Sequence, residues 1–181
     1  MSKERILGDA DINIDFIALM AKEHMLEHGT HLPTVIAVGS NGKGIGQLEG
    51  ALETHDERVR AMQVLGKVFR REGSIGQLQK IFFVSEGWMS VAKKPGADLM
   101  RPSLDPNRIE VLVVSELDLQ TKKTNMLLFE MRRDERKKLI EIKPYDADEA
   151  KSRETKSFLL EAFIRGYYSS VAGTNGNQHL H

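Results

Sequence analysis

The stretch KIFFVSEGWMSVA at positions 80–92 decides the fold that we predict for this chain. Its first half is apolar at every position from Ile81 to Val84, and its second half alternates around Trp88, the single tryptophan of the sequence. Side chains of a β-strand point alternately to its two faces. Because both faces are apolar from Ile81 to Val84, the pattern predicts an interior strand that is covered on both sides.

The segments around this strand predict three helices and five further strands. Helices are expected at about 11–28, 55–72 and 148–168, and strands at 34–39, 43–49, 108–119, 124–132 and 138–143. Gly29 and Gly73 suit the positions just past two helix ends, and Thr54 and Glu57 match a capping box. Runs of strands joined by short turns predict an α+β fold in the order α-β-β-α-β-β-β-β-α, with a mainly antiparallel sheet of about six strands and the helices on one face or at one end.

Two details of this prediction are specific. Asn41-Gly42 lies between two apolar segments and predicts a two-residue hairpin turn in which both residues adopt positive φ. The segment from Arg108 to Leu119 alternates between apolar and charged residues. Its charged side, which includes Glu110 and Glu116, predicts a strand with a solvent-facing outer surface.

The composition is that of an ordinary globular domain. Hydrophobic residues make up 40% and charged residues 29%, and 26 basic and 26 acidic side chains balance, so no overall charge attracts nucleic acid or an anionic membrane. The absence of cysteine excludes disulfides, a thiolate nucleophile and zinc sites built on sulfur. No apolar run approaches the ~18 to 20 residues of a membrane span, and the start lacks a signal-peptide pattern. We therefore expect a single α+β domain over residues 1–171, a flexible tail over 172–181 and a cytoplasmic location.

The sequence HMLEH at positions 24–28 matches the pattern H-x-x-E-H at the end of the first helix. Histidines at i and i+4 lie one turn apart and can share a metal ion, while the intervening glutamate can activate bound water. Over these residues the chain resembles the inverted zinc metallopeptidases. The resemblance implies His24 and His28 as zinc ligands and Glu27 as the catalytic base, with a third, carboxylate ligand downstream. Glu86 is the best candidate for it, and His31 is another neighbour. The alternative is that histidine favours a helix C-terminus, where the dipole and free carbonyls stabilise it.

The stretch GSNGKG at positions 39–44 resembles the phosphate loop of the ligases that activate carboxylates with ATP. In such a loop backbone amides cradle phosphates, the lysine neutralises them and the next hydroxyl residue holds magnesium. Here that next residue is Ile45, so the magnesium ligand is missing, and no helix start follows. An ordinary hairpin accounts for every residue of the stretch, and we expect no nucleotide cofactor.

Basic residues recur in two loops that a meander of strands would bring to one end of the sheet, because successive antiparallel strands reverse direction. These residues are Lys93, Lys94, Arg101, Arg133, Arg136 and Lys137. Together they would form an anion patch or a nucleic-acid contact. The acidic residues Asp98 and Asp134 lie in the same loops and favour the alternative of ordinary solvated turns.

Glu86 places a carboxylate in a strand that is predicted to be buried. It needs a partner such as Arg108 or one of the two helix histidines, or else a raised pKa that keeps it neutral. One interpretation is a structural ion pair. The other makes Glu86, Trp88 and Arg108 the lining of a pocket under the long loop 93–107.

The functional expectation follows from these partial motifs. SEGWM at positions 85–89, with DPNRIEVLVV at 105–114 opening the next strand, resembles small prokaryotic α+β proteins of unknown function over roughly the middle half of the chain, which implies no activity. The final helix is apolar nearly all round from Phe158 to Tyr168, which indicates a partner surface. We expect a non-enzymatic binding or interaction module that forms a homo-oligomer, needs no cofactor and does not bind membranes, with a further protein partner left open. The alternatives are a small metal-dependent hydrolase with zinc, and a module that binds polyanions or nucleic acid at the basic end of the sheet.

Overall fold

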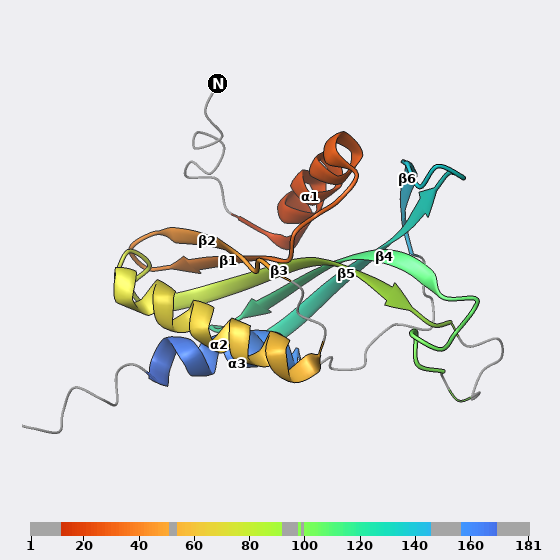
Figure 1. Cartoon of the computed structure of the whole chain (residues 1–181). Helices are drawn as coiled ribbons and strands as arrows, with labels where there is room; N and C mark the ends of the chain where they lie inside the picture. Colours follow the sequence, from red (N-terminus) through yellow and green to blue (C-terminus); the bar gives the residue numbers. More distant parts are fainter. Residues whose placement is uncertain (1–11, 51–53, 92–97, 99, 146–156, 170–181) are drawn as a thin grey trace, which may run out of the picture.

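The computed structural model of the chain describes residues 12–50, 54–91, 98, 100–145 and 157–169, and it contains one open antiparallel sheet in the order β2-β1-β3-β4-β5-β6 (Figure 1). The strands are β1 (Thr34–Gly39), β2 (Lys43–Gln47), β3 (Leu78–Met89), β4 (Ile109–Asp118), β5 (Lys123–Arg133) and β6 (Leu139–Pro144), and the helices are α1 (Ile14–His28), α2 (His55–Glu72) and α3 (Phe158–Ser169). The predicted α+β class, the antiparallel sheet and the order of elements are confirmed. The tail predicted over 172–181 lies outside the described residues.

The central strand β3 is covered on both faces. Phe82 and Val84 belong to the buried cluster that includes α1, whereas Ile81 and Phe83 belong to the cluster that includes α2 and α3. Figure 1 shows α1 on one side of the sheet and α2 with α3 on the other. The predicted interior strand is therefore confirmed, and the expectation that all helices share one face or end is wrong. A strand with apolar side chains on both sides buries all of them only if both faces of the sheet are covered, and here a helix covers each face.

Local sequence signals set the helix ends. The side chain of Asn13 accepts a hydrogen bond from the backbone at the start of α1. Thr54 and Glu57 form the predicted capping box before α2, with hydrogen bonds of 2.9 and 3.2 Å. Gly29 and Gly73 end α1 and α2 at φ values of 75° and 70°, where glycine is the favoured residue. Among the described helices, none combines the length and the apolar character that a membrane crossing requires.

The turn between β1 and β2 differs from the prediction. The N–H of Gly39 donates to the carbonyl of Gly42 at 2.9 Å, so Ser40 and Asn41 are the two loop residues, and neither they nor Gly42 has a positive φ. The N–H of Asn41 donates instead to the carbonyl of Ile75 at 3.0 Å. A tertiary contact thus fixes the turn where the sequence predicted a local conformation. Since β2 follows directly, this loop has no helix N-terminus to offer a phosphate.

The charged side of β4 does not face solvent, so this prediction is wrong. Glu116 is buried, and the side chain of Glu110 is only 17% exposed. Both residues share the face of Leu112 and Val114, which pack in the α1 cluster. The side chain of Asn125 donates to the carboxylate of Glu116 at 2.7 Å. Helix α1 covers this face, and polar groups on β5 make the burial of the carboxylates tolerable.

Two glycines allow α2 and α3 to pack backbone against backbone. A Cβ atom on Gly66 would clash with the carbonyl oxygen of Phe163, and one on Gly166 would clash with the carbonyl oxygen of Gln63. The neighbouring Tyr167 is fully buried, and its hydroxyl donates to the carbonyl of Gly76 at 2.6 Å. This contact fixes the pair of helices over one face of β3.

The substitution Gly66→Ala should lower the free energy of unfolding by about 2 kcal/mol or more, because the added methyl group forces the α3 backbone away from α2. Urea denaturation monitored by circular dichroism measures the change. The control is Val64→Ala on the exposed side of the same helix, which should stay within about 0.5 kcal/mol of the wild type. Equal losses in the two variants would show that the close helix contact does not govern stability.

Candidate functional site

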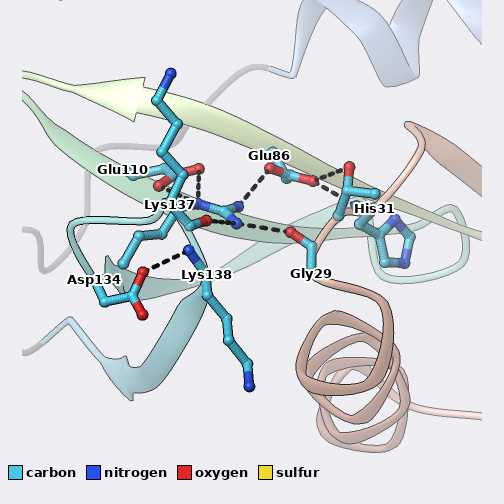
Figure 2. Close-up of polar contacts among 9 residues, drawn as sticks. Gly29, His31, Glu86, Glu110, Asp134, Lys137 and Lys138 are labelled. Carbon is cyan, nitrogen blue, oxygen red and sulfur yellow. Dashed lines mark hydrogen bonds and ion pairs between the residues drawn. The ribbon is translucent and has the colours of Figure 1, made fainter.

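An ion-pair network ties the end of α1 to the sheet (Figure 2). Arg133, the last residue of β5, donates from Nε to both carboxylate oxygens of Glu110 on β4, at 3.0 and 2.9 Å. Its Nη1 donates to the carbonyl oxygen of Gly29 at 2.8 Å, and its Nη2 lies 3.5 Å from the carboxylate of Glu86 on β3. The hydrogen bond to Glu110 raises the pKa of Arg133, and the attraction of both carboxylates outweighs the opposing effect of burial.

Glu86 also fixes the segment that follows α1. One of its carboxylate oxygens accepts hydrogen bonds from the Thr30 hydroxyl, at 3.0 Å, and from the backbone N–H of His31. The side chain of Glu86 is 24% exposed, so its charge needs the partners that it has. The helix end, β3, β4 and β5 are thereby joined by two carboxylates and one guanidinium.

The partner of Glu86 differs from the sequence prediction, which named Arg108 or a helix histidine. Arg133 takes this role, although the sequence had assigned it to an anion patch. In the ladder between β4 and β5, Met131 lies opposite Glu110, and Arg133 lies two residues further along on the same face. The strand register therefore decides the pairing.

Beside this network a cleft of about 1120 Å³ follows the end of β3. Strand β1 pairs with β3 only as far as Val84, whereas β4 pairs with it as far as Met89. Among the described residues, no strand pairs with the β1-side edge of β3 from Ser85 onward. The cleft lies at this open edge. Its other walls come from the ends of β1 and β2, from α2 and from the loop before β4: Pro33, Leu48, His55, Arg58, Arg101 and Pro102.

Trp88 and Arg108 form a stacked pair in the cleft wall. Trp88 is 52% exposed, and the guanidinium carbon of Arg108 lies 4.5 Å from the centroid of its ring. Arg108 also donates to the carbonyl oxygen of Pro102 at 3.2 Å, which holds the preceding loop against the pair. The three residues predicted to line a pocket, Glu86, Trp88 and Arg108, all line this cleft.

The residues that line the cleft carry an excess of positive charge. Its two acids, Glu86 and Glu110, are both paired with Arg133 behind the wall. Within the described residues neither Arg101 nor Arg108 forms an ion pair. The cleft therefore presents cations, a flat aromatic ring and an open strand edge to a ligand.

The histidines near the end of α1 lie close together. The ring centroids of His24 and His28 are 4.4 Å apart, and that of His31 is 5.1 Å from His24. The carboxylate of Glu86 is engaged by the contacts given above. Across the part of the chain that the structure describes, no group of three or more histidine, aspartate or glutamate side chains has an arrangement that could hold a metal ion. Glu27 is exposed and lies 3.5 Å from His28, and its role as a base stays a prediction.

The residues predicted to form an anion patch are distributed over two hollows. Arg101 lines the cleft, whereas Arg133 and Lys137 line a smaller hollow of about 370 Å³ beside the end of α1. The remaining members are Arg136, in the turn between β5 and β6, and Lys93 and Lys94, which lie outside the described residues. Lys138 lines this hollow as well. Figure 2 shows Lys137 and Lys138 in the turn where Asp134 accepts the backbone N–H of Lys138 at 2.9 Å.

Comparison with known proteins gives this chain no relative: no family model, no curated protein and no solved structure matches it. The function therefore has to be argued from the geometry of the cleft.

Replacing Arg133 should destabilise the fold, because Glu86 and Glu110 then lose their cation in a half-buried site. We expect Arg133→Met to lower the free energy of unfolding by roughly 2 kcal/mol, as for the loss of hydrogen bonds to charged groups. Thermal or urea denaturation checks this value. The adjacent Arg132 is 53% exposed, and Arg132→Met should change stability by less than about 0.5 kcal/mol. If both variants unfold alike, the network does not hold α1 to the sheet.

Proposed function

We propose that this protein is a cytoplasmic, non-enzymatic interaction module that binds an extended acidic segment of a partner protein in the cleft along β3. The observation that carries the proposal is the open edge of β3 beside the stacked pair of Trp88 and Arg108.

The open edge offers backbone hydrogen bonds to such a segment. The N–H of Leu119 donates to the carbonyl of Gln79 at 2.8 Å. In an antiparallel ladder every second residue is bonded to the same neighbour, so Ser85 and Gly87 of β3 bond to β4. Glu86 and Trp88 alternate with them and direct their N–H and C=O groups away from β4. An extended peptide can add to an exposed edge of this kind as a further strand, where main-chain bonds supply affinity.

The size and charge of the cleft favour the same class of ligand. Its volume of about 1120 Å³ lies above the ≈ 300–1,000 Å³ that is usual for small-molecule pockets. Arg101 and Arg108 suit carboxylates, since a guanidinium can donate two parallel hydrogen bonds to one acid. The exposed ring of Trp88 and the wall residues Pro33 and Leu48 supply apolar contact for the side chains between the acids.

The single tryptophan of the chain provides a direct test, because Trp88 lies in the cleft. A capped hexapeptide of alternating glutamate and valine should change the Trp88 fluorescence saturably, with a dissociation constant below about 1 mM. The matched hexapeptide of lysine and valine should leave it unchanged, and so should glutarate, which carries the acid without a peptide backbone. Added salt should weaken the response, since the acids are recognised by charge.

The variant that tests the assignment is Arg108→Gln, which removes the charge from the stacked pair. It should weaken binding of the acidic hexapeptide roughly tenfold, as for the loss of a charge-assisted hydrogen bond. Arg136→Gln, in the turn between β5 and β6, is the control and should bind as the wild type does. A response to the lysine peptide, or equal affinity of both variants, would rule the proposal out.

A further inference from the structure

The two outer edges of the sheet differ in how far they are protected. On β6, the N–H of Tyr145 donates to the carbonyl of Leu128 at 2.9 Å, so the backbone of the preceding Pro144 points outward. Proline has no N–H to offer there, and the register between β5 and β6 shifts between Arg132 and Arg133, which interrupts the regular ladder. Both features prevent a further strand from adding to a sheet edge.

The edge at β2 has neither feature. The N–H of Leu48 donates to the carbonyl of Pro33 at 2.8 Å. In the antiparallel ladder Gly46 and Gly44 therefore also direct their backbone N–H and C=O groups toward β1. The residues that alternate with them, Lys43, Ile45 and Gln47, therefore direct their N–H and C=O groups away from the sheet. The edge of β2 contains no proline, and its pairing with β1 runs through five successive pairs without a bulge.

We propose that β2 pairs with β2 of a second copy of this chain, antiparallel and about a two-fold axis at Ile45. Ile45 then lies opposite Ile45 of the second copy, and Lys43 lies opposite Gln47. In this register the residues with outward-directed backbone groups face one another, so that the N–H and C=O of each find partners. The two sheets become one continuous sheet across the dimer.

The side chains on the α1 face of β2 fit this register. Ile45 lies beside the buried Ile36 and is itself 53% exposed, so pairing would cover an apolar side chain that one copy leaves in water. No like charges face one another, because Lys43 meets an uncharged glutamine. Lys43 also lies diagonal to Glu49 of the second copy, which is a favourable cross-strand pair.

The other face of β2 carries no side chains of its own. Its residues there are Gly44 and Gly46, and a Cβ on either would meet the side chains of Leu65 or Phe69 from α2. A glycine opposite a glycine brings no side chain between the two strands. Lys43, Ile45 and Gln47 do not line the cleft, which this segment reaches only at Leu48 and Gly50, so a substitution at Ile45 tests the dimer without changing a residue of the peptide site.

The first test is sedimentation velocity at protein concentrations up to about 1 mM, which detects dissociation constants in that range. The wild type should form a dimer. Ile45→Lys should be monomeric, because two lysines would then face each other across the axis. Ile140→Lys, which replaces a similarly exposed isoleucine on β6, should remain dimeric. A monomeric wild type, or a dimer that Ile45→Lys leaves intact, overturns the proposal.

The second test uses the absence of cysteine from the chain. Residues opposite each other in a hydrogen-bonded antiparallel pair have Cα atoms about 5.5 Å apart, which is within the span of a disulfide. The Ile45→Cys variant should therefore form a disulfide-linked dimer under mild oxidation, whereas Ile140→Cys should not. If the two variants cross-link equally or not at all, β2 is not the interface, whatever the folding of Ile45→Lys.

Discussion

The structure depends on the burial of both faces of one strand. From Ile81 to Val84, β3 carries apolar side chains on each side, and exposing either set would cost about 1.5–3 kcal/mol per large side chain. Helix α1 covers one face and the α2–α3 pair covers the other, so segments that are distant in the sequence must meet at β3. The pairing of β3 with β1 ends at Val84, and the cleft lies beside the part of β3 that continues beyond it.

The cover of β3 also explains the polar network at its end. The segment that follows α1 places the carbonyl of Gly29 and the N–H of His31 against the sheet. There they lie beside the carboxylates of Glu86 and Glu110. Arg133 connects these groups, because one guanidinium can donate to two carboxylates and a carbonyl at once. The same pairing offsets one of the two negative charges of the cleft wall. The ion pairs of Arg133 thus stabilise the helix end and also influence the charge that a ligand meets beside Trp88.

The sequence predicts what local patterns control. The order of elements, the capping box at Thr54 and the two-sided burial of Ile81 to Val84 follow from spacing and residue type within short windows. The cation beside Glu86 and the burial of Glu116 depend instead on the register between β4 and β5 and on where α1 packs, which no short window contains. Glu86, Trp88 and Arg108 could be grouped in advance because they lie on one strand and at the start of the next.

The most direct measurement of the central claim is amide hydrogen exchange along β3, residue by residue. Exchange should be slow at every position from Ile81 to Val84, because alternate amides there bond to β1 and β4. Beyond Val84 the amides of Ser85 and Gly87 should exchange slowly, since they face β4, whereas those of Glu86 and Trp88 should exchange rapidly. Uniform protection or uniform exposure from Ser85 to Trp88 would contradict the account.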